Sequence, residues 1–298
     1  MLRERITTSI PLVLLALVAF LWPGWPGAVV FAVLCCAFLV VGARELFAMT
    51  DALGFPGRPG LVGGLGCALV VIAMPWGGPA VRLSLVNPFS ALAALVIVLL
   101  LIALFFDVFR RGPSREAILN ALVSVGGFVY LCWTLSFVAK LYFIEGTGST
   151  GRVLTAFLIV GTKLADVGAF AVGTAGAKRP GGNHQLVPSL SPKKSWEGLA
   201  GGTVASVLCT LTFLAVAGRH LQVAQVNVIG FWSAVVLGVL FSVVGLIGDL
   251  AESALKRASG TKDSGRLPGL GGALDVLDSL IFVAPIFYCY VQLMAMLQ

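Results

Sequence analysis

Residues 248–279 read GDLAESALKRASGTKDSGRLPGLGGALDVLDS and lie between two long apolar runs, 235–247 and 280–296. This stretch contains five of the thirteen acidic residues of the chain and four of its twenty lysines and arginines. Charges beside membrane-like sequence are costly to bury unless they are paired or hold a ligand. The stretch therefore predicts two membrane-spanning helices and a polar site where one of them ends and the next begins.

The composition excludes soluble classes of protein. The chain has 298 residues, of which 58% are hydrophobic and 11% charged, with a mean hydropathy of +1.00. A soluble domain carries roughly 25% charged residues. The six cysteines lie in apolar runs without C-x-x-C spacing, so neither a disulfide framework nor a zinc site is indicated. We conclude that the chain is an integral membrane protein.

Apolar runs long enough to span a bilayer set the expected fold. A spanning helix needs about 20 apolar residues. The sequence predicts an all-α, polytopic protein with about nine such helices, of which the first and third are the shortest. They are 8–22, 28–50, 60–76, 89–109, 117–142, 153–175, 197–217, 227–251 and 273–297. The fifth has a candidate break at Gly126 and Gly127. We expect N-terminal transmembrane helices over 1–116 and a catalytic transmembrane region over 117–298.

Basic residues predict the orientation in the membrane. Cytoplasmic loops are enriched in lysine and arginine. With a cytoplasmic N-terminus and nine spans, the inner loops hold fifteen of the twenty basic residues and the outer loops three, Arg82, Arg152 and Arg219. We therefore expect a multi-pass protein of the inner (plasma) membrane whose charged stretches 176–197 and 249–275 face the cytoplasm.

The sixth span contains the polar residues Thr162, Lys163 and Asp166, followed by Gly168. Lys163 and Asp166 are three positions apart and share one face of a helix. One interpretation is an ion pair that only packs. The other is a polar face that lines a site, because ionisable groups at membrane depth are costly.

Residues 191–198 read SPKKSWEG and lead into the seventh span. Ser195 is a plausible N-cap of that helix. Lys193 and Lys194 near the helix N-terminus would form an anion site. The alternative is that these lysines and Trp196 are ordinary cytoplasmic and interfacial residues.

The acids of 248–279 form the third polar group. Asp249, Glu252, Ser253 and Lys256 form one stripe of the eighth helix, whereas Asp275 and Asp278 share a face of the ninth. Acids in a first turn suit the helix dipole, which is the simpler explanation. Several facing carboxylates without basic partners of their own, as we expect for Asp249 and Asp275, are unfavourable without a cation. Mg²⁺ held by carboxylates and substrate phosphates fits this pattern.

At these residues the sequence resembles the phosphatidate cytidylyltransferase family. The matching positions are Asp166, Gly168, Ala169, Phe170 and Gly173; Ser191 to Gly198; and Ser253, Lys256, Arg257, Lys262, Asp263, Pro268, Gly271, Gly272, Asp275 and Asp278. Two positions depart from the family pattern: Leu270 stands where the pattern has His, and Val276 where it has Arg. All the carboxylates of the pattern are present.

The resemblance implies that the chain transfers a cytidylyl group from CTP to phosphatidate in the lipid bilayer, with Mg²⁺ and a second cation as candidate cofactors. The implied catalytic residues are Asp249, Asp275, Lys256, Arg257, Asp263 and Lys262. The implied substrate-binding residues are Ser191, Lys193, Lys194, Ser195, Asp166, Lys163, Ser253 and Arg266. The implied metal ligands are Asp249, Asp275 and Asp278. A second copy of the chain is a candidate partner, and nucleic acid is not expected.

Two other functions stay open on the sequence. A CTP-dependent kinase of polyprenol or phytol would also place polar helix ends at the cytoplasmic face. A non-enzymatic ion or proton transporter would use Lys163, Asp166 and Asp249. Transport favours acids at mid-membrane on several helices, whereas most acids here cluster at one face.

Overall fold

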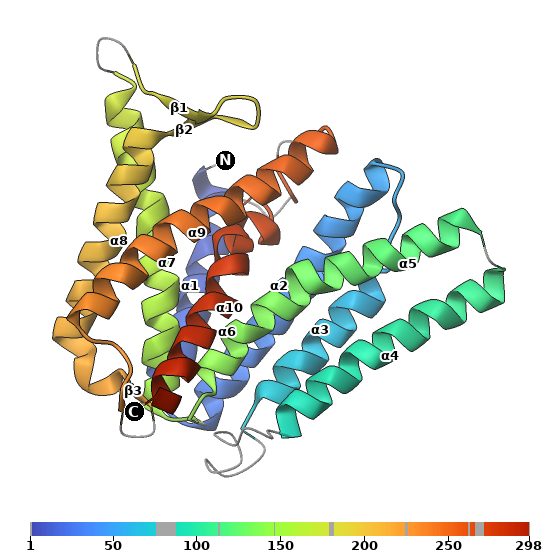
Figure 1. Ribbon diagram of the computed structural model, residues 1–298, viewed down its shortest axis with the longest axis horizontal. Coiled ribbons are helices and arrows are strands. Elements are labelled where there is room, and N and C mark those ends of the chain that lie inside the picture. The colour runs from blue at the N-terminus through green and yellow to red at the C-terminus, as the bar shows by residue number, and fades with distance from the viewer. Residues whose placement is uncertain are drawn as a thin grey trace. The chain divides into compact units, whose positions relative to one another are not determined.

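The computed structural model describes residues 2–75, 88–112, 114–145, 147–178, 182–223, 226–261, 263–265 and 271–297 (Figure 1). Helices dominate this part of the chain: α1 (Leu2–Leu21), α2 (Trp25–Ala52), α3 (Pro59–Ala73), α4 (Pro88–Arg111), α5 (Arg115–Gly127), η2 (Phe128–Trp133), α6 (Thr134–Tyr142), α7 (Ser149–Gly176), α8 (Trp196–Ala217), η3 (Gly218–His220), α9 (Phe231–Ala258) and α10 (Ala273–Leu297). Two short antiparallel hairpins complete it, β1 (Gln185–Val187) with β2 (Ser191–Ser195) and β3 (Gln222–Val223) with β4 (Val226–Asn227).

Seven helical segments of the described residues are long and apolar enough to cross a membrane. Two further apolar helical segments, Pro11–Leu21 and Pro59–Ala73, are shorter. They correspond to the first and third predicted spans, which the sequence already marks as the shortest. The prediction of an all-α polytopic membrane protein is confirmed, and its count of nine spans holds approximately.

The fifth predicted span is continuous rather than broken. Its 28 residues, Arg115–Tyr142, begin as α5 and end as α6. Between them lies η2, a π-helical segment that starts directly after Gly127. A π segment widens the helix locally and keeps the backbone hydrogen-bonded. The glycine pair therefore marks a change of helix type where the sequence suggested an interruption.

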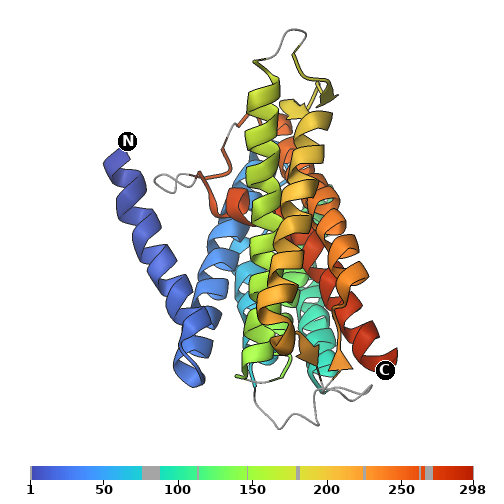
Figure 2. The ribbon, with the colours of Figure 1, turned by 90° about the vertical axis from the view of Figure 1, so that its left-hand side faces the viewer.

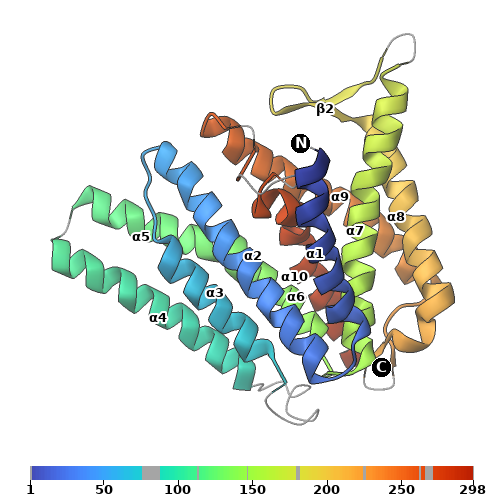
Figure 3. The ribbon, with the colours of Figure 1, turned by 180° about the vertical axis from the view of Figure 1, so that it is seen from behind.

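The chain divides into two compact units. The first comprises residues 1–148 and 258–276, and the second comprises 149–257 and 277–298. In the first unit, α3 packs against both α2 and α4, and Figures 1 and 3 show these helices side by side. Tyr142 at the end of α6 stacks on Phe31 of α2, with 3.7 Å between ring centroids. The functional division at residue 116 stays a prediction.

In the second unit, α7 and α8 lie side by side along most of their length (Figure 2). Small residues make this approach close: a Cβ on Gly168 of α7 would lie 2.5 Å from the Ala205 Cβ of α8. Glycine and alanine allow such contacts between membrane helices. The Ser206 hydroxyl of α8 also donates to the Gly161 carbonyl of α7, at 3.1 Å.

Four helices of the second unit share an aromatic core. Phe157 of α7, Phe241 of α9 and Phe287 of α10 are fully buried. Their ring centroids lie 5.3–5.6 Å apart, and Phe213 of α8 adds an edge contact to Phe157 at 5.8 Å. Aromatic pairs at this spacing stabilise a core beyond their buried area. The cluster fixes the helices that carry the charged residues of this unit.

The β1–β2 hairpin extends from the ends of α7 and α8 (Figures 1 and 3). Gln185 pairs with Ser195 and Val187 with Ser191. Pro192 lies in β2, and a hairpin of two strands accommodates a proline because each strand has one edge outside the pairing. The hairpin leads directly into α8, whose N-cap is Ser195 as predicted: the Ser195 hydroxyl accepts from the Gly198 N–H at 3.0 Å.

Candidate active site

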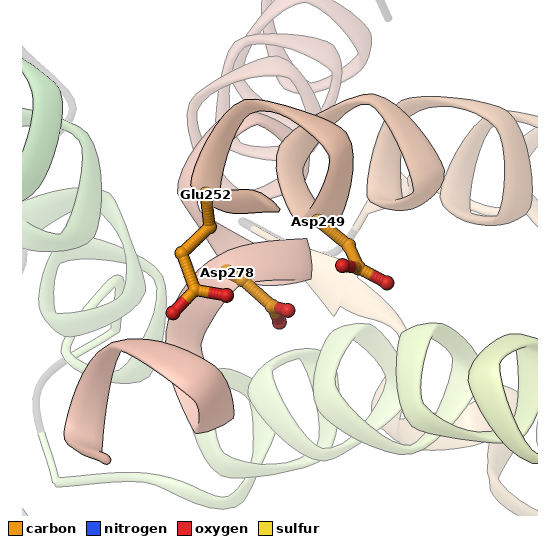
Figure 4. Close-up of side chains that lie close together, drawn as sticks. All are labelled: Asp249, Glu252 and Asp278. Atoms are coloured by element: carbon orange, nitrogen blue, oxygen red, sulfur yellow. The ribbon is translucent and has the colours of Figure 1, made fainter. Parts of the chain in front are cut away.

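Three carboxylates of the second unit come together where α9 and α10 meet (Figure 4). Asp249 and Glu252 extend from α9, and Asp278 extends from α10. One oxygen of each lies within 4.8 Å of the other two. Glu252 is fully buried and Asp278 is 8% exposed. Two buried acids beside a third that is half-buried require cationic partners.

A glycine on α9 makes this meeting possible. A Cβ on Gly248 would lie 2.2 Å from the Asp278 carbonyl oxygen of α10. A Cβ on Gly245, one turn earlier, would lie 3.5 Å from the Ser279 Cβ. The close approach therefore requires glycine at 248. It brings Asp249, the next residue along the chain, toward Asp278.

Lysines neutralise the three acids. Lys194 of β2 lies 2.7 Å from Asp249, and Lys256 of α9 lies 2.6 Å from Glu252. Lys163 of α7 lies 3.6 Å from Asp278. The expectation that Asp249 lacks a basic partner is wrong: β2 supplies one from far away in the sequence, where spacing along a helix cannot reveal it.

Lys163 belongs to a wider network. Its ammonium lies 3.3 Å from Asp166, as the shared helix face predicts, and donates to the Ser279 hydroxyl at 2.7 Å. Ser279 in turn donates its hydroxyl to Asp166 at 3.1 Å and its N–H to Asp278 at 2.6 Å. The ion pair Lys163–Asp166 is thus joined to the acid cluster and does more than pack two helices.

A cavity of about 280 Å³ adjoins the cluster. Its polar lining comes from α7, β2 and α9 and comprises Asp166, Ser191, Lys193, Lys194, Ser195, Ser242 and Asp249. A second cavity of about 510 Å³ lies between the end of α7 and the hairpin. Both share Phe170, Lys193 and Ser195. The second cavity lies within the size range of small-molecule sites, about 300–1,000 Å³, and the first is just below it.

The acid cluster has the chemistry of a site for a divalent cation. Mg²⁺ takes oxygen ligands at about 2.1 Å, so two ligands on opposite sides of the ion lie about 4.2 Å apart. Small side-chain movements would bring oxygens that now lie within 4.8 Å to that spacing. The residues that would hold the ion are Asp249, Glu252 and Asp278. These residues fit Mg²⁺ because all three donors are carboxylate oxygens.

Asp275, also predicted to bind the metal, has a different environment. Its carboxylate accepts from the Ser264 N–H at 3.2 Å and from the Ser264 hydroxyl at 2.9 Å. It is not one of the three acids of the cluster. Its role as a ligand stays a prediction.

The other residues predicted for the site differ in whether they contact the cluster. Ser253 donates to Asp249 at 3.3 Å, whereas Arg257 donates to the Leu190 carbonyl in the hairpin turn at 3.5 Å. Asp263 is exposed. Lys262, Arg266 and Leu270 lie outside the described residues.

Two residues of the cluster network were not predicted as site residues. Glu252 was assigned only to the polar stripe of the eighth span, although its position three residues after Asp249 gives it the same face. Ser279 follows Asp278 directly and is fully buried. A serine in an apolar helix gives little sequence signal, because its hydroxyl often bonds back to its own helix.

The fold and this site define a class of protein that comparison with known sequences identifies. The chain belongs to the cytidylyltransferase family, whose model matches residues 3–294. Among its relatives is the phosphatidate cytidylyltransferase of Staphylococcus epidermidis, 31% identical over 289 residues, which cover 96% of this chain and 97% of that protein. The phosphatidate cytidylyltransferase of Mycobacterium bovis is 33% identical over 286 residues, which cover 92% of this chain and 82% of the relative. The family resemblance seen in the sequence is confirmed.

Proposed function

We propose that this protein transfers a cytidylyl group from CTP to phosphatidate, giving CDP-diacylglycerol and pyrophosphate. The observation that carries the proposal is the acid cluster of Asp249, Glu252 and Asp278. One of its members, Asp249, lines a cavity between membrane-length helices together with its partner Lys194. The names of the relatives, which span nearly the whole chain, support the same reaction. Neither a lipid kinase nor a transporter is favoured by these relatives.

The proposed reaction balances without a general base. An anionic oxygen of the lipid phosphate forms a bond to the α-phosphorus of CTP, while the bond from that phosphorus to the β-phosphate bridging oxygen breaks. The electron pair leaves with pyrophosphate. The protein must align these atoms and neutralise the charge of the triphosphate. Lys193 and Lys194, which line the cavity, are placed to bind phosphate oxygens.

Asp249, Glu252 and Asp278 are the residues that would hold Mg²⁺, and Asp275 stays a proposed contributor. When bound, Mg²⁺ supplies Lewis-acid stabilisation of negative charge on phosphate oxygens. In this proposal the acids would hold the ion, and the lysines would supply positive charge on flexible side chains that can reach phosphate oxygens. Lys256, Arg257, Asp263, Lys262 and Arg266 stay proposed as further phosphate-binding or supporting residues.

The lysine–carboxylate pairs suggest how the site changes when substrate arrives. Lys194 neutralises Asp249, and Lys163 neutralises Asp278. When substrate binds, Lys194 and Lys163 would turn from these acids to the phosphates of the nucleotide and the lipid. A lysine has a flexible stem and a compact charge, so it can exchange partners with small movements.

The lipid substrate would reach the site from the bilayer. Phe170 lines both cavities and its side chain is 75% exposed. Val167, one turn earlier on α7, is 60% exposed. In a helix that spans a membrane, such apolar side chains contact acyl chains. We propose that diacylglycerol chains lie along this face of α7.

We further propose that the protein lies in the plasma membrane with the site at the cytoplasmic face, where CTP is present. Lys193→Cys and Arg257→Cys, made without the exposed Cys289, should label with a membrane-impermeant maleimide only after cells are permeabilised. Labelling of both in intact cells would reverse the orientation. A second cation and a second copy of the chain stay predictions.

The decisive experiment uses purified protein in detergent with phosphatidate, Mg²⁺ and CTP labelled at either the α- or the γ-phosphate. Cytidylyl transfer leaves the α-label on the lipid and releases the γ-label as pyrophosphate. A kinase would deliver the γ-label to the lipid. No labelled lipid from either substrate, with protein that is folded and monodisperse, would overturn the proposal.

A further inference from the structure

Glu45 is an acid of α2 that lies about two turns before the end of the helix. It lies in the first compact unit and is 8% exposed. Its carboxylate accepts from the backbone N–H groups of Ala273 and Leu274, both at 3.0 Å. It also accepts from the Ser264 hydroxyl at 3.2 Å. These contacts join α2 to the first turn of α10.

The first turn of a helix has N–H groups without partners inside the helix. A carboxylate at that end satisfies them and interacts favourably with the helix dipole. In most helices this carboxylate comes from the cap residue itself. Here Glu45 performs the same task from another helix, more than two hundred residues away in the chain.

Ser264 connects this cap to Asp275. The Ser264 hydroxyl lies within hydrogen-bond distance of the carboxylates of both Glu45 and Asp275, at 3.2 and 2.9 Å. Two glycines leave the space for it: a Cβ on Gly265 would lie 2.0 Å from Glu45 Oε1, and one on Gly272 would lie 2.0 Å from Ser264 Oγ. We call Glu45, Ser264 and Asp275 the α10 anchor.

The anchor holds the first turn of α10, the helix that carries Asp278 farther along. Residues 273–276 of α10 belong to the first unit, and residues 277–298 belong to the second. Asp278 lies less than two turns after the residues that Glu45 caps. A slip of one residue at the start of an α-helix shifts later positions by about 1.5 Å and turns them by about 100°. Such a shift would remove Asp278 from the cluster.

We infer that Glu45 is a positioning residue for the divalent-cation site and acts through α10 on Asp278. The inference rests on the proposed function, because that proposal assigns the cation to Asp249, Glu252 and Asp278. A purely structural role for Glu45 would predict a different result: its loss would lower the melting temperature and leave the cation affinity of the folded protein unchanged.

The test measures binding of Mn²⁺, a paramagnetic substitute for Mg²⁺, by electron paramagnetic resonance in purified protein without substrate. Glu45→Gln should weaken Mn²⁺ binding roughly tenfold, the lower end of the about 10–100-fold effect of groups bonded directly to metal ligands, because Glu45 acts on Asp278 only through the helix. Glu45→Asp keeps the charge and should restore part of the affinity. Ser264→Ala should weaken binding less than Glu45→Gln. Glu116→Gln, an exposed acid in the first turn of α5, is the matched control and should bind as wild type.

Mn²⁺ affinity in folded Glu45→Gln equal to that of wild type would overturn the inference. If Glu45→Gln does not fold, the Mn²⁺ affinities of Glu45→Asp and Ser264→Ala serve instead: values equal to that of wild type would overturn the inference. Asp278→Asn is the reference for loss of the site. Should the wild type make no CDP-diacylglycerol yet bind Mn²⁺ in an Asp278-dependent and Glu45-dependent manner, the proposed function fails and the positioning role stands.

Discussion

Two groups of acids differ in the kind of partner that they have. In the α10 anchor, Glu45 accepts hydrogen bonds from backbone N–H groups and a hydroxyl. In the acid cluster, Asp249, Glu252 and Asp278 each lie beside a lysine. Backbone donors cannot move without unwinding the helix. Lysine donors can move, because their stems are flexible.

This difference separates Glu45, whose hydrogen bonds stabilise the start of a helix, from the three cluster acids, to which the proposed function assigns a ligand. A buried carboxylate satisfied by backbone donors has a fixed geometry and gains little from a cation. Under the proposed function, Asp249 and Asp278 would hold a divalent ion, and their lysine partners would bind phosphate. The partner of a buried acid therefore indicates its role better than the acid itself does.

The largest expected effect is at the cluster. Asp249→Asn or Asp278→Asn should each lower kcat by roughly 10²–10³-fold, since a metal supplies several kcal/mol of charge stabilisation. Mg²⁺ should raise the melting temperature of wild type and not of either variant. The double variant should be hardly worse than the singles, because either loss empties the same site. An active Asp249→Asn enzyme would show that these acids only hold the helices together.

A smaller effect is expected at Lys194. Lys194→Ala should raise the apparent KM for CTP or lower kcat by roughly 10–150-fold, the equivalent of a charge-assisted contact of about 1.5–3 kcal/mol. Without nucleotide, the same variant should bind Mn²⁺ more tightly than wild type, because the ammonium no longer competes for Asp249. The exposed Lys178→Ala is the control for loss of a positive charge. Weaker Mn²⁺ binding by Lys194→Ala would argue against exchange of partners.

Gly248→Ala tests the close approach of α9 and α10. Its Cβ would lie 2.2 Å from a backbone oxygen of α10, so the helices must separate. Overpacking of this kind costs about 1–3 kcal/mol, and the melting temperature should fall. Gly126→Ala, where a Cβ meets no atom within 4 Å, should leave it unchanged or raise it. Equal melting temperatures for the two variants would contradict the tight contact.

The smallest effect compares two N-caps with the same geometry. Ser114 accepts from the Ala117 N–H at 3.1 Å and Ser195 from the Gly198 N–H at 3.0 Å. Ser114→Ala and Ser195→Ala should each cost about 1 kcal/mol of stability. Only Ser195 lines the cavities, so only Ser195→Ala should also raise the KM for CTP. Equal KM values in thermally matched variants would limit Ser195 to capping.

The sequence predicted the helices well because apolar length is a strong signal in membrane proteins. It also placed Ser195 at the start of α8 and paired Lys163 with Asp166, since both follow from spacing within one helix. These are local relations. A helix repeats every 3.6 residues, so neighbours on one face can be counted directly from the sequence.

What the sequence missed are relations between distant segments. Lys194 reaches Asp249 from a strand, and Glu45 reaches the start of α10 from the second helix. No periodicity within one element reports such contacts. The change of helix type after Gly127 was also hidden, because glycine is compatible with a break, a close contact or an altered turn.

The position of the Phe170 ring on α7 has a consequence for how products would leave the proposed enzyme. Phe170 borders both cavities, and 75% of its surface is exposed. With acyl chains along α7 as proposed, this single aromatic side chain would separate the polar cavities from the lipid. The two products of the proposed reaction belong to different phases, pyrophosphate to water and the liponucleotide to the bilayer. In this arrangement they would leave in different directions, so neither product would need to wait for the other.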